Sequence, residues 1–244
     1  MLYRIILLML FCQAAIAGEV NVAVAANFAA PAKQIAELFE KETGNRVSLS
    51  MGATGKFYAQ IREGAPFDVL LAADEETPRL LDQQNLAVAG SGFVYAEGKL
   101  VLWSAKPGYV DGKGAVLGSS DKIAIADPRL APYGRAAMEA LQNMNLWEKV
   151  QGRMVTGESI GQTYQFAASG NAELAFIALS QIMKDGKVSQ GSWWLVSTNL
   201  YHPIRQAAVE LASAKDKKVA GAFLAFLKSR EAAAIIESYG YGMP

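Results

Sequence analysis

The spacing of hydrophobic positions along the chain changes repeatedly between a period of two and a period near 3.6. Residues 20–26 form a short apolar run rich in valine, which is typical of a buried strand. Residues 28–43 then place Ile35 and Phe39 on one face of a helix, which Gly44 ends. The same order continues with a strand at 46–51, a helix at 56–63, a strand at 67–73 and a helix capped by Asp74 that runs to residue 84. This rhythm predicts an α/β fold with mostly parallel sheets and helices on both faces.

The alternation of strands and helices is interrupted between residues 91 and 103, where glycine-flanked strands are predicted to lead the chain out of the first unit, and it then resumes. Further strands are predicted at 123–126, 154–155, 173–178, 193–196 and 204–211, and further helices at 133–144, 162–168, 219–228 and 232–239. The chain thus contains two βα units of about 90–100 residues each, a usual size for a domain. We therefore expect two lobes, lobe I formed by residues 18–99 plus 205–244 and lobe II by 100–204. Such lobes close around a ligand in the cleft between them.

The first seventeen residues differ from the rest of the chain. Arg4 is followed by the apolar run 5–11, and the segment closes with Ala15-Ile16-Ala17, the small-residue pattern of a cleavage site. The run is shorter than the roughly 20 residues that a membrane span needs. Residues 1–17 are therefore predicted to be a secretory signal peptide, and the mature chain is expected to begin at Gly18 without any cysteine.

The composition argues against several classes of protein. Lys plus Arg and Asp plus Glu number 23 each, so the net charge favours neither nucleic acid nor attraction of an anion. His202 is the only histidine, which disfavours a Ser-His-acid triad and the usual zinc sites. Residues 52–56 resemble part of a phosphate loop, but the spacing is incomplete and Phe57 stands where a Ser or Thr is needed. An enzyme is therefore disfavoured.

Four junctions between a strand and a helix are rich in small residues and hydroxyl groups. A helix start offers free backbone N–H groups and a positive dipole end, which favour an anion. For one junction alone an ordinary cap is the simpler interpretation, as for Asn27, which occupies an N-cap position. Four junctions, two in each half, all lie at carboxyl ends of strands and are expected to converge in the cleft. They span residues 25–31, 51–56, 127–134 and 156–161.

Several segments of the mature chain also carry a family resemblance. They are residues 22–31, the block from 60 to 74, residues 126–134 and the terminal 239–241. Through them the chain resembles the periplasmic molybdate-binding proteins of bacterial ABC importers over essentially its whole mature length. The resemblance implies a two-lobed periplasmic-binding-protein fold of type II and the binding of molybdate or tungstate. It also implies a periplasmic monomer without cofactor or enzymatic activity, which delivers the anion to the membrane permease of an ABC importer.

The resemblance also implies which residues hold the anion. In the family a dehydrated tetrahedral dianion is bound by neutral donors alone, and no side chain ligates the metal directly. Asn27 would donate its side-chain amide and backbone N–H, Thr54 its hydroxyl and N–H, and Ile160 its N–H, with Ala26 beside Asn27. Tyr133 lies in the third junction, where some members use a tyrosine hydroxyl.

One position departs from the more common family pattern. Many members supply a tyrosine hydroxyl from the strand that here ends in Ala178, so this chain lacks that donor. We expect Tyr133 to replace it, as in the family subgroup that has Asn in the first junction.

Charged residues beside the junctions are expected to stay out of the site. Molybdate carries no proton near neutral pH, so a site built only of donors suits it, whereas a carboxylate would repel it. Asp127 and Glu158 are therefore expected to support loops. Lys56 and Arg135 are expected to point outward, because a strong counter-charge would slow release of the anion.

Three other interpretations remain at this stage. The anion could be another tetrahedral oxyanion such as sulfate, because selection between oxyanions depends on cavity size. The chain could be a secreted enzyme on the same fold, or a sensor that docks to a membrane partner without transport.

Overall fold

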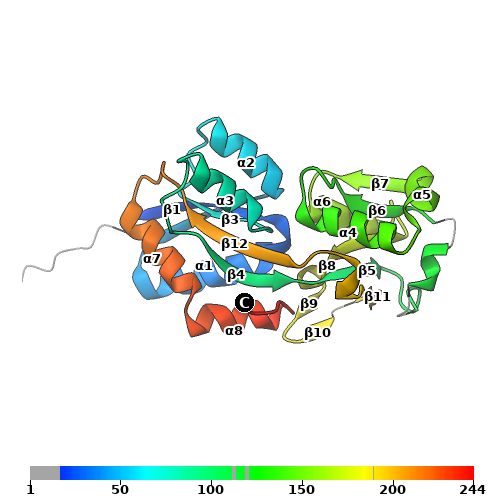
Figure 1. Cartoon of the computed structure of the whole chain (residues 1–244). Helices are drawn as coiled ribbons and strands as arrows, with labels where there is room; N and C mark the ends of the chain where they lie inside the picture. Colours follow the sequence, from blue (N-terminus) through cyan, green and yellow to red (C-terminus); the bar gives the residue numbers. More distant parts are fainter. Residues whose placement is uncertain (1–16, 112–113, 119–120, 189) are drawn as a thin grey trace, which may run out of the picture.

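The computed structural model describes residues 17–111, 114–118, 121–188 and 190–244. The predicted signal peptide lies outside these residues except for its last position. No helix in the described part of the chain is long and apolar enough to cross a membrane. Figure 1 shows two sheets with their helices, arranged as two lobes side by side.

Lobe I is built on a five-stranded sheet with the order β2-β1-β3-β12-β4. Strand β1 pairs in parallel with β2 and with β3, whereas β12 pairs antiparallel with β3 and β4. The parallel register brings the ends of β1 and β2 side by side, with Ala25 opposite Gly52. The strands are β1 (Glu19–Ala25), β2 (Arg46–Gly52), β3 (Val69–Leu71), β4 (Phe93–Gly98) and β12 (Ile204–Glu210).

Helices cover both faces of this sheet because successive strand residues point to opposite sides. Val22 and Val24 pack among α1 (Ala29–Thr43), α7 (Lys217–Leu227) and α8 (Arg230–Ser238), whereas Ala23 packs among α2 (Thr54–Arg62) and α3 (Glu76–Gln83). Helix α1 ends as predicted at Gly44, whose φ of 72° is the left-handed conformation that glycine adopts without strain.

Lobe II is built on a second five-stranded sheet with the order β11-β5-β8-β6-β7. Ala126 at the end of β6 lies opposite Gly157 at the end of β7, so the third and fourth junctions are neighbours. The strands are β5 (Leu100–Ser104), β6 (Ile123–Ala126), β7 (Met154–Gly157), β8 (Leu174–Ala178) and β11 (Ser192–Leu195). Helices α4 (Pro132–Asn143) and α5 (Trp147–Val150) pack on one face, and α6 (Ile160–Ala168) packs on the other.

The α/β class and the two lobes were predicted, but each sheet is mixed rather than mostly parallel. The two parallel pairings in each sheet belong to the βα units, and the two antiparallel pairings involve strands next to the crossings between lobes. The chain crosses from lobe I to lobe II between β4 and β5, and returns between β11 and β12. A strand that arrives from the other lobe runs against its neighbours, which explains the difference.

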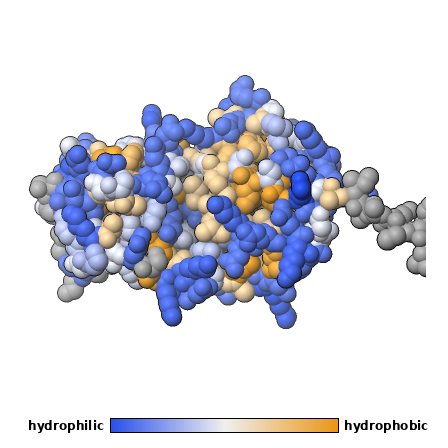
Figure 2. Space-filling view, turned by 180° about the vertical axis from the view of Figure 1, so that it is seen from behind, coloured by the Kyte–Doolittle hydropathy of each residue, from blue (hydrophilic) through white to orange (hydrophobic). Residues whose placement is uncertain are grey.

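Two short elements were not predicted. They are helix α5 and a hairpin of β9 (Met183–Lys184) and β10 (Lys187–Val188). Both are too short to show a hydrophobic period. The face of the molecule opposite to that in Figure 1 carries mostly hydrophilic side chains with apolar ones between them, as is usual for a protein surface (Figure 2).

Candidate functional site

A small cavity lies between the two lobes, where the four predicted junctions meet. All five residues predicted to hold an anion line it, three from lobe I and two from lobe II. The lining is uncharged, and it consists of Ala25, Ala26, Asn27, Gly52, Ala53, Thr54, Ala73, Ala131, Pro132, Tyr133 and Ile160.

Asn27 lies in the short 3-10 turn η1 (Ala26–Phe28) that joins β1 to α1, and it is buried. Its side-chain amide donates to the Gln206 Oε1 at 2.8 Å and to the Tyr241 hydroxyl at 2.9 Å. Both amide hydrogens are therefore engaged inside the protein. The amide is therefore not free to donate into the cavity, as the resemblance implied that it would. Asn27 is not a helix cap either, because the N-cap of α1 is Phe28 and no side chain caps it.

Thr54 is the first residue of α2 and is only 1% exposed. Its hydroxyl oxygen accepts the Ala73 N–H at 3.0 Å, which leaves the hydroxyl hydrogen free to donate. Its backbone N–H belongs to the first turn of the helix, where no intrahelical acceptor exists. Thr54 thus presents two donors at one end of the cavity.

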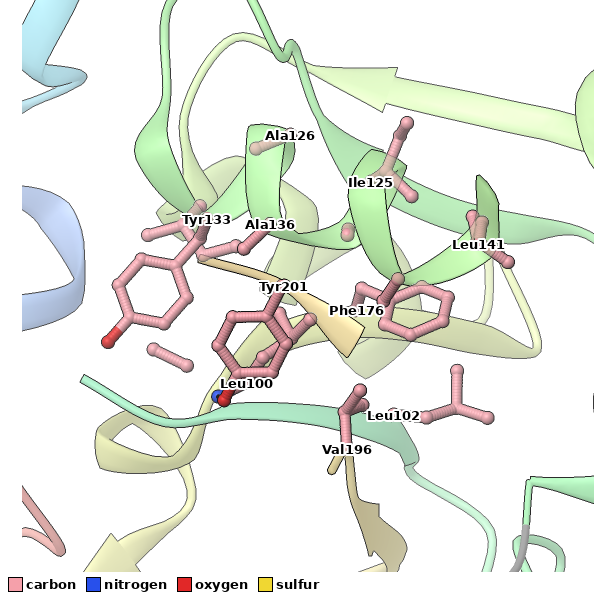
Figure 3. Packing of buried hydrophobic residues seen from close by; sticks show 14 of the residues in the cluster. Leu100, Leu102, Ile125, Ala126, Tyr133, Ala136, Leu141, Phe176, Val196 and Tyr201 are labelled. Carbon is pink, nitrogen blue, oxygen red and sulfur yellow. The ribbon is translucent and has the colours of Figure 1, made fainter. Parts of the chain in front are cut away.

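Tyr133 is the second residue of α4 and is 1% exposed. Its ring packs in the core of lobe II, and Figure 3 shows its hydroxyl pointing away from the other labelled side chains. The hydroxyl accepts a hydrogen bond from Gln206 Nε2 at 3.2 Å. Burial, followed by the nearby Tyr241 and other tyrosines, raises the pKa of this phenol well above 10, so it remains protonated.

Ile160 is the first residue of α6, and Ser159 caps this helix by accepting the Gln162 N–H. The Ile160 carbonyl accepts a hydrogen bond from Gln181 Nε2 at 2.9 Å. This bond holds the start of the helix from behind. The Ile160 N–H lies in the first turn and has no intrahelical acceptor, so it is a further neutral donor.

The lobes touch around the cavity. The Gly55 N–H donates to the Leu130 carbonyl at 2.9 Å, and a Cβ on Gly161 would lie 3.3 Å from the Ala26 Cβ. Lys56 also forms an ion pair with Glu158 across the boundary. The structure is therefore closed.

The charged residues beside the junctions behave largely as expected. Lys56 and Arg135 are 43% and 46% exposed, and Arg135 pairs with Glu76 of lobe I at 3.2 Å. Both cations thus point outward, as predicted. Asp127 supports its loop through three hydrogen bonds from Arg129, and these hydrogen bonds hold the pKa of the Asp127 carboxyl below its usual range. Exposed ion pairs of this kind contribute about 0–1 kcal/mol each.

Ala178 at the end of β8 is fully buried and shares one hydrophobic cluster with Tyr133. This position therefore presents no hydroxyl, whereas Tyr133 does. Among the described residues, no group of three His, Cys, Asp or Glu side chains is placed to hold a metal ion.

A buried polar network, which was not predicted from the sequence, lies behind the cavity. The Tyr241 hydroxyl has two acceptors at 2.9 Å for its single hydrogen, the Asn27 carbonyl and the Ser180 Oγ, and Ser180 donates to the same carbonyl at 2.8 Å. Gln206 joins this network to Tyr133. The only signal in the sequence is Gln206 itself, a polar residue at an inward-facing position of strand β12.

The chain is similar to known proteins over nearly its whole length. The sequence profile of the family described as bacterial extracellular solute-binding protein matches residues 20–242. The chain belongs to this family. The solute-binding protein is 54% identical to the molybdate-binding protein ModA of Azotobacter vinelandii, over 96% of this chain and 94% of that protein. It is 51% identical to ModA of Rhodobacter capsulatus, over 93% of this chain and 89% of that protein.

A solved structure agrees with these relatives. The periplasmic molybdate-binding protein of Azotobacter vinelandii superposes with a TM-score of 0.90 at 45% identity, covering 92% of this chain and 99% of that one. The two-lobed fold expected of the solute-binding protein is thereby confirmed. These relatives are solute-binding proteins rather than enzymes.

Proposed function

We propose that this solute-binding protein captures molybdate, and equally tungstate, in the cavity between its lobes. The observation that supports this most is the convergence of Ala26, Asn27, Thr54, Tyr133 and Ile160 on one uncharged cavity. These are the positions that a resemblance to molybdate-binding proteins singles out, and two relatives of that name are more than half identical to the chain.

The chemistry of the cavity suits a tetrahedral dianion. The backbone N–H groups of Asn27, Thr54 and Ile160 and the hydroxyls of Thr54 and Tyr133 offer hydrogen-bond donors from both lobes. Hydrogen bonds to an ionised acceptor are roughly twice as strong as neutral ones, and helix starts add a favourable dipole. Because the Asn27 amide is engaged elsewhere, we assign its contribution to the backbone N–H. Tyr133 takes the role of the tyrosine that is absent at position 178.

The wider role that we propose is delivery of the anion to the membrane permease of an ABC importer. The protein would act outside the cytoplasm as a monomer, after removal of residues 1–17. Lobe I would comprise residues 18–99 and 205–244, and lobe II residues 100–204. The positions of the two crossings between the sheets support this division.

Titration calorimetry with four anions tests the proposed ligand. Molybdate and tungstate are expected to bind tightly, because the hydrogen-bond donors of the cavity replace the water molecules that these anions lose on binding. Sulfate and phosphate are expected to bind at least about 100-fold more weakly, a difference of about 2.7 kcal/mol. A sulfate affinity comparable to that of molybdate would contradict the proposal.

The Tyr133→Phe variant tests the proposed role of the tyrosine hydroxyl. It removes a hydrogen bond to a charged group, so the affinity for molybdate should fall by about 1.5–3 kcal/mol. The ring and its packing stay, but the buried Gln206 Nε2 loses its acceptor, so the free protein should also lose about 1–3 kcal/mol of stability. Tyr58→Phe is the matched control, since its hydroxyl accepts a hydrogen bond from the exposed Gln84. An unchanged affinity in Tyr133→Phe would show that another group supplies the missing donor.

A further inference from the structure

Gln206 is a fully buried polar side chain on β12, the strand by which the chain returns to lobe I. Its Oε1 accepts hydrogen bonds from the Asn27 amide at 2.8 Å and from the Tyr95 hydroxyl at 3.1 Å. Its Nε2 donates to the Tyr133 hydroxyl at 3.2 Å. Gln206 does not line the cavity, but it contacts two residues that do.

These bonds fix the direction of hydrogen donation. An amide nitrogen only donates and an amide oxygen only accepts. Because the Asn27 amide nitrogen donates to Oε1, the nitrogen of Gln206 faces Tyr133. The Tyr133 oxygen is thereby used as an acceptor on the side of Gln206.

The hydrogen of the Tyr133 hydroxyl is left for another partner. Within the part of the chain that the structure describes, no acceptor receives it. The phenol also stays protonated, because its pKa is raised by burial. A hydroxyl normally donates or accepts as its surroundings require. With Gln206 behind it, this one is restricted to donating.

We propose that Gln206 is a positioning residue that determines specificity, because it makes the Tyr133 hydroxyl an obligatory donor toward the bound anion. This inference rests on the proposed function. A fully deprotonated oxyanion presents only acceptors, so it satisfies such a site. A singly protonated oxyanion carries an O–H that finds no acceptor there, and a buried donor without a partner is costly.

The test compares molybdate with arsenate at mildly alkaline pH in the wild type, Gln206→Glu and Gln206→Met. Both anions are then dianions, but arsenate is mainly the singly protonated form. An ionised glutamate only accepts hydrogen bonds, so the Tyr133 hydroxyl would donate its hydrogen to residue 206. The Tyr133 oxygen would then face the anion as an acceptor. The added charge disfavours both dianions alike, so it cancels in the ratio of their dissociation constants. This ratio therefore reports the direction of the hydrogen bond between Tyr133 and residue 206.

The ratio of the arsenate constant to the molybdate constant is expected to fall by about tenfold or more in Gln206→Glu. It is expected to fall by less in Gln206→Met, where the Tyr133 hydroxyl is free to rotate. The methionine variant also gives a result if the buried carboxylate prevents folding. Gln84→Glu is the matched control, because Gln84 also donates to a tyrosine hydroxyl, that of Tyr58, but on the exposed surface.

If Gln206 had only a structural role, its substitution would raise both dissociation constants by the same factor and leave their ratio unchanged. That result would overturn the inference. The proposed function has a separate criterion. If the wild type does not bind molybdate, the proposed function is wrong. If it binds molybdate tightly while the ratio stays constant across the Gln206 variants, only the role of Gln206 is wrong.

Discussion

Replacing Gly98 with alanine is expected to lower the affinity for molybdate by at least about 100-fold, or about 2.7 kcal/mol. A Cβ at this position would lie 2.0 Å from the Tyr133 hydroxyl and 2.8 Å from Gln206 Nε2. The Tyr133 ring is buried, so it can relieve this clash only by shifting as a whole, which carries its hydroxyl out of position in the site. The effect should exceed that of Tyr133→Phe, because the added methyl group also disturbs the amide behind the hydroxyl.

Calorimetry of Gly98→Ala alone and combined with Tyr133→Phe separates this cause from general damage. Neighbouring substitutions that act through one group are not additive. The double variant should therefore lose less binding free energy than the sum of the two single losses, because phenylalanine removes the atom nearest to the new Cβ. Gly152→Ala is the control, because nothing lies within 4 Å of its added Cβ. Strict additivity would contradict the explanation.

Replacing Gly134 with alanine is expected to lower the free energy of unfolding by about 3 kcal/mol, at the upper end of the usual cost of overpacking. Its Cβ would lie 2.2 Å from the Ala126 carbonyl oxygen and 3.0 Å from the Asp127 carbonyl carbon. These atoms belong to the backbone at the end of β6, which cannot rotate away. The first turn of α4 would have to lift off the sheet, carrying Tyr133 with it.

Urea denaturation of the ligand-free protein measures this loss. Alanine is favoured over glycine in a helix by about 1 kcal/mol, so the steric cost must exceed that gain. Gly221→Ala in α7 is the matched control, because its Cβ would meet only the end of the Glu210 side chain, at 3.8 Å. It should be neutral or stabilising. Equal stability of both variants would show that α4 adjusts freely.

Much of the fold follows from local pattern. The valine-rich run of β1, the apolar face of α1 and the glycine after it each specify their own structure. The site also follows in outline, because carboxyl ends of parallel strands collect helix starts at one edge. The position of β12 between β3 and β4 does not follow, since pairing of these strands depends on segments far apart in the chain.

The side chain of Asn27 shows a limit of prediction from the local sequence. Asparagine just before a helix favours a cap, and no neighbouring residue argues otherwise. In the folded protein its amide instead bonds Gln206 and Tyr241, which are 179 and 214 residues away in sequence. Two buried partners that satisfy both amide hydrogens outweigh a cap that water can replace. The contact of Gly98 with Tyr133 is equally non-local, so no local pattern reveals why that glycine is needed.

The division of the cavity between the lobes has a geometric consequence. Ala26, Asn27 and Thr54 approach the cavity from one side, and Tyr133 and Ile160 from the other. An anion too large for this space would hold Lys56 and Glu158 apart at the rim, and one too small would leave a gap on one side. If the protein binds its anion here as we propose, the distance between the lobes would depend on the radius of that anion, and a partner that contacts both lobes would distinguish the correct solute by this distance.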